Sequence, residues 1–284
     1  MICNAGIIDL GDYSVVFDTG LTPRAGEDIR LAARTLTGKE PSLVVNSHHH
    51  NDHIRGNQAF REALFVSTLR NQHLINTKGR ADLKDDGAVA AQSIEDLKKL
   101  VQSENKEERQ YATLFLPYWE GIVTTLPETE ICPPHLGFEE ELDLFGKKRM
   151  AKLISLGGGH SESDCIMFLP DEKILFLGDL LFTKCHPFLA GGNPQESIRT
   201  LKHLQTFDAQ QLVPGHGATG DKSDLTAMIE YIETLTDMAR GVRRRGGTIK
   251  DAISEPVPDR FAGWTMARPF FQANMSFLYS RSEP

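Results

Sequence analysis

The chain has 284 residues, of which 40% are hydrophobic and 25% are charged, an ordinary composition for a globular protein. This length suits one large α/β domain, or one domain with a long insertion. The formal net charge of −8 argues against a broad electrostatic attraction to nucleic acid.

The N-terminus predicts neither a signal peptide nor a membrane anchor. "MICNAGIIDLGD" lacks a basic segment followed by a long apolar run, and no apolar run in the chain approaches the ~18 residues of a membrane span. The four cysteines show no CxxC spacing and are too few for a disulfide framework. We therefore expect reduced thiols in a cytoplasmic protein that has no membrane partner.

The first part of the chain predicts a strand, a helix and a second strand. "DYSVVFDTG" is a β-rich run that reaches Asp18, and "RAGEDIRLAARTL" has apolar residues at helical spacing. The next apolar run, "SLVVNS", leads directly to His48 and His50. Polar residues therefore follow each of the two predicted strands.

The segment 69–126 differs from its surroundings. "SIEDLKKLVQ" and "ERQYATLFLPYWEGIV" have helical periods, whereas "TKGRADLKDDG" is typical of a connection. The apolar cluster around Pro117 favours a helical layer with a small core of its own. The alternative is that this insertion forms a lid or a wall over an active site.

The second half repeats the order of the first. After several predicted antiparallel strands, "EKILFLGD" predicts a strand that ends in Asp179. "NPQESIRTLKHLQTF" predicts a helix with Asn193 as its cap and Pro194 in its first turn, and "QQLVPGH" predicts a short strand that delivers His216. Both halves run strand, Asp, helix, strand, His, which indicates that polar residues gather on one rim. Two further helices are expected, in "DLTAMIEYIETLTDMARGVRRR" and in "WTMARPFFQANMSFLY", the second covering the sheet.

The stretch "NSHHHNDHIRGN" is typical of a metal site. His48 and His50 are two residues apart, so that in an extended loop they can converge on one ion. Asp52 and His53 follow at once and can point to a neighbouring position. Three or four protein ligands complete a mononuclear site, so the four candidates in this cluster would already be about as many as one ion can bind. His49 alternates away from the others, which favours a supporting or solvent-facing role.

Three more candidates follow predicted strands much later in the chain: His160 after three glycines, Asp179 in "FLGDLLF", and His216 in "VPGHG". A carboxylate at the end of an apolar strand is costly without a charged partner. Together the candidates number five histidines and two aspartates, enough for two adjacent ions that share a carboxylate.

These motifs, with "VVFDTG" before them, resemble the metallo-β-lactamase fold superfamily from about Asp9 to Gly217. The resemblance implies an α/β fold, a four-layer αββα sandwich, in a single domain over residues 1–284 with the helical insertion 69–126 inside it. The chain departs from the family by having almost nothing before the early motif, where one or two strands are usual. The resemblance also implies ligand roles: His48, His50 and His160 for a first metal, Asp52, His53 and His216 for a second, Asp179 as the bridge, and Asp18 as the residue that orients the histidine loop.

The resemblance further implies a hydrolase that cleaves an acyl bond of a small molecule (a lactam, lactone, ester or thioester) with a metal-bound hydroxide. Asp52 would orient the hydroxide and carry its proton to the leaving group. Zinc suits the imidazole-rich ligands best, and iron or manganese also fit them. An aspartate at the position of Asp179 is similar to the glyoxalase II, lactonase and general hydrolase branches, whereas the true β-lactamases commonly have another residue there. The alternatives are an iron-dependent persulfide dioxygenase-like enzyme, a glyoxalase II-like thioesterase and a non-catalytic metal-binding protein.

Overall fold

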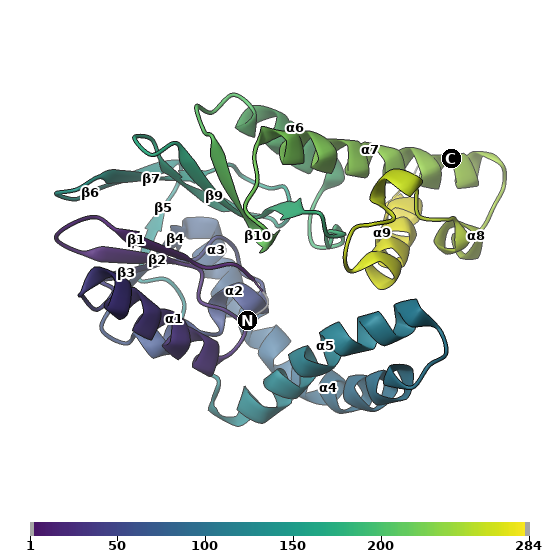
Figure 1. The fold of residues 1–284 in the computed structure, drawn as a ribbon, viewed down its shortest axis with the longest axis horizontal. Coiled ribbons are helices and arrows are strands. Elements are labelled where there is room, and N and C mark those ends of the chain that lie inside the picture. Colours follow the sequence, from purple (N-terminus) through teal and green to yellow (C-terminus); the bar gives the residue numbers. More distant parts are fainter. Residues whose placement is uncertain (1–2, 282–284) are drawn as a thin grey trace.

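The computed structural model describes residues 3–281, apart from the side chains of residue 107 and residues 267–269. Two five-stranded sheets lie face to face, and helices cover the outer face of each (Figure 1). This arrangement confirms the predicted α/β class and the αββα layers. None of the described helices is both long and apolar enough to cross a membrane. The four cysteines are free, as expected.

The first sheet has the order β1-β2-β3-β4-β5 and is parallel except for its first pair. Its strands are β1 (Gly6–Asp9), β2 (Ser14–Phe17), β3 (Leu43–Val45), β4 (Leu64–Thr68) and β5 (Leu136–Phe138). We expected almost nothing before the early motif, but β1 forms there and pairs with β2. Ile8 is buried in the core between the sheets, which explains why so short a strand is held.

The second sheet has the order β10-β9-β8-β7-β6. Its strands are β6 (Glu141–Phe145), β7 (Met150–Ser155), β8 (Cys165–Leu169), β9 (Ile174–Thr183) and β10 (Gln211–Gly217). Strands β6 to β9 form antiparallel neighbours, as predicted, whereas β9 and β10 are parallel. The parallel pairs β2–β3 and β9–β10 are each joined through a helix, which confirms the repeated order of the two halves.

Strand β9 does not end at Asp179, as predicted, but continues to Thr183. Beyond the carboxylate it still pairs with β10, where Phe182 lies opposite His216. The ladder is irregular at this point, and Gly178 has a φ of 51°, a conformation that costs little only for glycine. The strand continues because the apolar residues after Asp179 are also buried. Asp179 therefore projects from an interruption within the strand and not from its end.

Helices α1 (Pro23–Thr37) and α6 (Pro194–Leu204) are the crossovers of the two halves. The side chain of Asn193 accepts hydrogen bonds from the first turn of α6, and Pro194 stands at its start, as the sequence predicted. Each helix buries one apolar face against its sheet and places the chain for the following parallel strand.

The insertion contains α3 (Leu69–Leu74), the π-helix η2 (Ile75–Gly79), α4 (Arg80–Val101), α5 (Lys106–Thr125) and the 3-10 turn η3 (Leu126–Glu128). The predicted connection over 77–87 is therefore wrong, because those residues form the end of η2 and the first turns of α4. Helix α4 packs along α5, which buries Ala90 and Leu97. A Cβ on Gly87 would lie 3.0 Å from a methyl of Leu126, so glycine permits this close approach.

The remaining elements are α2 (Asn51–Ile54), η1 (Asn57–Phe60), α7 (Lys222–Arg244), α8 (Ile249–Ser254), η4 (Asp259–Phe261) and α9 (Ala267–Arg281). Helix α7 packs on β9, whereas α9, which we expected to cover the sheet, packs mainly on α7 and α8. Arg243 donates to the carbonyl of Tyr279 at 3.0 Å and stacks on its ring. This contact fastens α9 to α7.

Candidate metal centre

The seven predicted ligand residues gather at one end of the sandwich, in two groups that lie side by side. In each group, one ligand atom from every residue lies within 4.8 Å of the others. The groups are His48, His50, His160 and Asp179, and Asp52, His53 and His216. His50 is half-buried and the other six are buried. Residues that lie up to 168 positions apart along the chain are thus brought into one cluster by β3, α2, β9, β10 and the loop between β7 and β8.

Three imidazoles converge in the first group. Nδ1 of His50 lies 2.9 Å from Nε2 of His48 and 2.9 Å from Nε2 of His160. Burial lowers the pKa of both His48 and His50 well below the usual value, so both rings are neutral. Neutral imidazoles that point lone pairs at a shared position are the form in which histidine binds metals.

Asp18 orients the histidine loop through three hydrogen bonds. It has a φ of 61°, and its carboxylate accepts from the backbone N–H of Ser47 at 2.7 Å, the hydroxyl of Ser47 at 2.7 Å and Nδ1 of His53 at 2.8 Å. Because the Ser47 hydroxyl donates to Asp18, it accepts from Nδ1 of His48, 2.9 Å away. Nε2 of both His48 and His53 is therefore left to face the centre.

Asp179 lies between the two groups and turns one oxygen toward each. Its Oδ2 lies 3.3 Å from Nε2 of His160 and 3.9 Å from Nε2 of His48. Its Oδ1 lies 3.1 Å from Nε2 of His53 and 3.4 Å from Nε2 of His216. This is the arrangement that a carboxylate bridging two cations requires.

The backbone of β10 leaves room for that carboxylate only because residue 215 is glycine. A Cβ on Gly215 would lie 1.9 Å from Oδ1 of Asp179, far inside van der Waals contact. The "PGH" of this strand therefore does two things: Gly215 admits the carboxylate, and His216 follows it into the second group.

The electrostatics of the second group fit a cation. Nε2 of His53 and Oδ1 of Asp179 are buried and make no hydrogen bond of good geometry. Although burial opposes its charge, Asp179 and the other nearby acids raise the pKa of His53 well above the usual value. The pKa of Asp52 falls to about 2, because the attraction of His53 and His216 outweighs the effect of burial. A site that attracts protons so strongly without a metal offers the same lone pairs to a metal.

Two other polar residues have clear places near the centre. His49, for which we left a supporting or a solvent-facing role open, is buried, and burial lowers its pKa to about 4. Asp164 accepts hydrogen bonds from the backbone and the hydroxyl of Ser161 and so holds the loop that carries His160. Ser47 was not among the predicted site residues, because its link from Asp18 to His48 has no sequence signature beyond its position before the histidines.

A cavity of about 290 Å³ opens over the centre. His50, Asp52, His160, Asp179 and His216 line one side. Aromatic residues line much of the rest, among them Phe115 and Tyr118 of α5. Part of the apolar cluster around Pro117 therefore faces this cavity.

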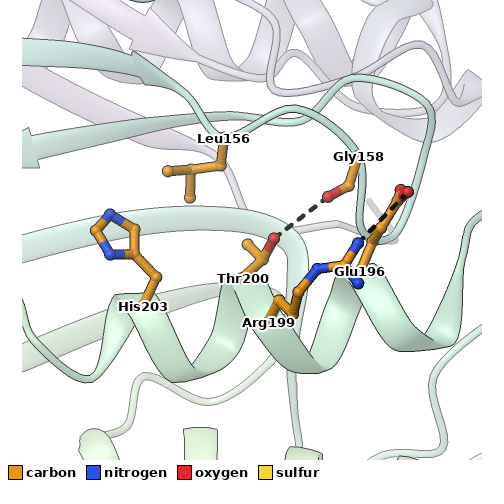
Figure 2. Close-up of a pocket in the computed structure, with 6 residues that line it drawn as sticks. All are labelled: Leu156, Gly158, Glu196, Arg199, Thr200 and His203. Atoms are coloured by element: carbon orange, nitrogen blue, oxygen red, sulfur yellow. Dashed lines mark hydrogen bonds and ion pairs between the residues drawn. The ribbon is translucent and has the colours of Figure 1, made fainter.

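A second cavity, of about 350 Å³, lies beside α6 and holds none of the seven residues. Figure 2 shows its lining, in which the Thr200 hydroxyl donates to the carbonyl of Gly158 at 3.3 Å. The guanidinium of Arg199 lies 3.7 Å from the carboxylate of Glu196, one turn away on the same helix. These groups already pair with each other, so the cavity over the metal centre is the better candidate for chemistry.

Several solved structures have the same fold and are remote in sequence. A metallo-β-lactamase from Pontibacter korlensis matches with a TM-score of 0.59 and 18% identity, over 80% of this chain and 85% of that one. The DIM-1 metallo-β-lactamase exposed to ceftazidime matches with a TM-score of 0.58 and 17% identity, over 82% and 85%. The mono-zinc form of the FIM-1 metallo-β-lactamase from Pseudomonas aeruginosa gives 0.57 and 15%, over 82% and 84%. At these identities the likeness concerns the fold alone.

No curated protein matches the sequence significantly. The family model of the metallo-β-lactamase superfamily matches residues 1–216, which include every residue of the two groups. With the sandwich fold and the paired His/Asp groups, this match places the chain in the metallo-β-lactamase superfamily.

Proposed function

We propose that the protein is a binuclear metal-dependent hydrolase that cleaves an acyl bond of a small molecule. The observation that carries this proposal is the position of Asp179, whose two oxygens face the two ligand groups separately. A site for one ion would not need a second set of three ligands beside it. A cavity of about 290 Å³ over both groups suits a small substrate.

In this proposal, each ligand group holds one divalent cation. His48, His50 and His160 hold the first, Asp52, His53 and His216 hold the second, and Asp179 bridges them. Zinc is the metal that we propose, because imidazole and carboxylate ligands in sets of three or four suit it well. Asp18 keeps the lone pairs of His48 and His53 directed at the centre.

The bound cations would lower the pKa of a water molecule and polarise the carbonyl of the substrate. Asp52 lines the cavity, with one oxygen 3.3 Å from Nε2 of His216. It is placed to orient the attacking water and to receive its proton. The protonated carboxyl would then pass the proton on to the leaving group.

Metal analysis of the purified protein, followed by a panel of lactam, lactone, ester and thioester substrates, tests the proposal. We expect about two ions per chain and turnover in at least one class. Asp52→Ala and His50→Ala should abolish turnover with the fold retained. Asp171→Ala and His73→Ala, at exposed positions, are the matched controls and should retain it.

Turnover by metal-free protein, or full activity in Asp52→Ala, would refute the hydrolase. Iron as the bound metal, together with oxygen consumption on a persulfide, would favour the dioxygenase instead.

A further inference from the structure

The cavity has an aromatic wall beside the ligand residues. We use this name for Phe115 and Tyr118 of α5, Phe188 of the loop after β9, and Met266 and Phe270 at the C-terminal end of the chain. The ring centroids of Phe115 and Phe270 lie 5.6 Å apart, and those of Phe188 and Phe270 lie 6.4 Å apart. These contacts join the insertion to the C-terminal part of the chain, as the closeness of α5 and α9 in Figure 1 indicates.

Contacts with the rest of the protein hold both the insertion and the C-terminal segment that form the wall. Helix α4 carries Asp86, whose carboxylate pairs with the buried guanidinium of Arg55, just after the histidine loop. On the other side, the N–H of His186 donates to the carbonyl of Thr265 at 2.9 Å, which holds the segment before Met266. The wall is therefore in place before a ligand arrives, and a ligand need not organise it.

The wall offers few polar groups and little positive charge. The hydroxyl of Tyr118 accepts from Nδ2 of Asn51 at 3.0 Å, and burial raises its pKa, so it stays protonated. Asp82 is exposed and lines the cavity. Among the lining residues described by the structure, none is Lys or Arg.

We propose that the substrate is uncharged and carries an apolar group, an aliphatic chain or a ring, that lies against the aromatic wall while its scissile carbonyl faces the metal centre. This inference rests on the proposed acyl hydrolysis. Burial of an apolar group between aromatic rings is favourable, and one extra methylene already changes selectivity by about tenfold or more. A carboxylate at the same place would lose its water beside apolar rings and the acidic Asp82.

Hydrolysis of matched esters by the metal-loaded protein tests the preference. We compare kcat/KM for p-nitrophenyl acetate, p-nitrophenyl hexanoate and the p-nitrophenyl monoester of succinic acid. The hexanoate should exceed both of the others by at least about tenfold. Phe270→Ala and Phe115→Ala should bring the ratio of hexanoate to acetate close to one. Phe145→Ala, on the exposed side of β6, is the control and should keep the wild-type ratio.

Calorimetric binding of anilides, which resist hydrolysis, gives a second and independent measurement. Hexananilide should bind wild type and Phe145→Ala at least about tenfold more tightly than acetanilide does, and this difference should vanish in Phe270→Ala and in Phe115→Ala. Equal binding of the two anilides by wild type would overturn the inference even if esters were hydrolysed. If the binding difference is present and none of the acyl compounds is hydrolysed, binding of an apolar group by the aromatic wall is supported and the proposed hydrolase is refuted.

Discussion

Oδ2 of Asp18 accepts hydrogen bonds from Nδ1 of His53 at 2.8 Å and from the hydroxyl of Ser47 at 2.7 Å. One carboxylate therefore sets the ring orientation of a histidine in the second group and, through Ser47, of His48 in the first. Asp18 lies at the end of β2, on the first sheet, whereas Asp179, which faces both groups, lies in β9, on the second. The centre is thus oriented from both sheets.

Asp18→Asn should weaken metal binding by about 10- to 100-fold, because removing a group that orients a ligand has an effect of this size. Asparagine tolerates the positive φ of this position, so the backbone should be retained. Titration of the metal against a chelator of known affinity measures the change. Asp12→Asn, at an exposed position, is the control, and equal affinity of both variants would contradict the role of Asp18.

Gly215→Ala should disrupt the bridge without touching a ligand residue. Its new methyl would overlap Oδ1 of Asp179, so the carboxylate must turn away from one of the ligand groups. We expect the metal content to fall from about two ions per chain to about one or fewer. Elemental analysis measures it, and Gly263→Ala, where a Cβ meets nothing within 4 Å, should bind metal as the wild type does.

Asp86→Ala should destabilise the protein by about 3 kcal/mol, because it leaves the guanidinium of Arg55 buried without its partner. Denaturant unfolding measures the loss. The double variant Arg55→Met with Asp86→Leu should recover much of it, since the buried charge is then also removed. Asp85→Ala, at the exposed neighbouring position, should change stability little. A loss in Asp86→Ala no larger than in Asp85→Ala would show that the pair does not hold α4.

His186 should make the protein sensitive to acid. It is buried, its Nδ1 lies 2.9 Å from the hydroxyl of Tyr231, and burial lowers its pKa to about 4. Its pKa in the unfolded chain is about 6.5, so between these values the unfolded state binds the additional proton. The contribution of His186 to the free energy of unfolding should therefore be fully present above pH ~6.5. It should fall by about 3 kcal/mol as the pH drops to ~4. His186→Gln should lack this part of the acid loss in unfolding free energies measured across that range. The same slope in both proteins would contradict the assignment.

The candidate metal ligands could be predicted because metal chemistry limits the residue types that bind an ion. His48, His50, Asp52 and His53 lie within six positions, and His160 and His216 are each preceded by glycine. The order of elements was also visible in the sequence, since strand and helix periods are local properties. The structure brings these residues together in the predicted sandwich.

Other features depended on packing between distant segments. The charged residues at the start of α4 are helical because that helix packs on α5. The apolar cluster around Pro117 contributes Phe115 and Tyr118 to the cavity because Phe270, far along the chain, lies opposite. The sequence by itself determined which side chains can bind a metal, because donor chemistry belongs to the residue. Only the tertiary structure decided what surrounds them, because burial and contact depend on elements that are distant in the chain.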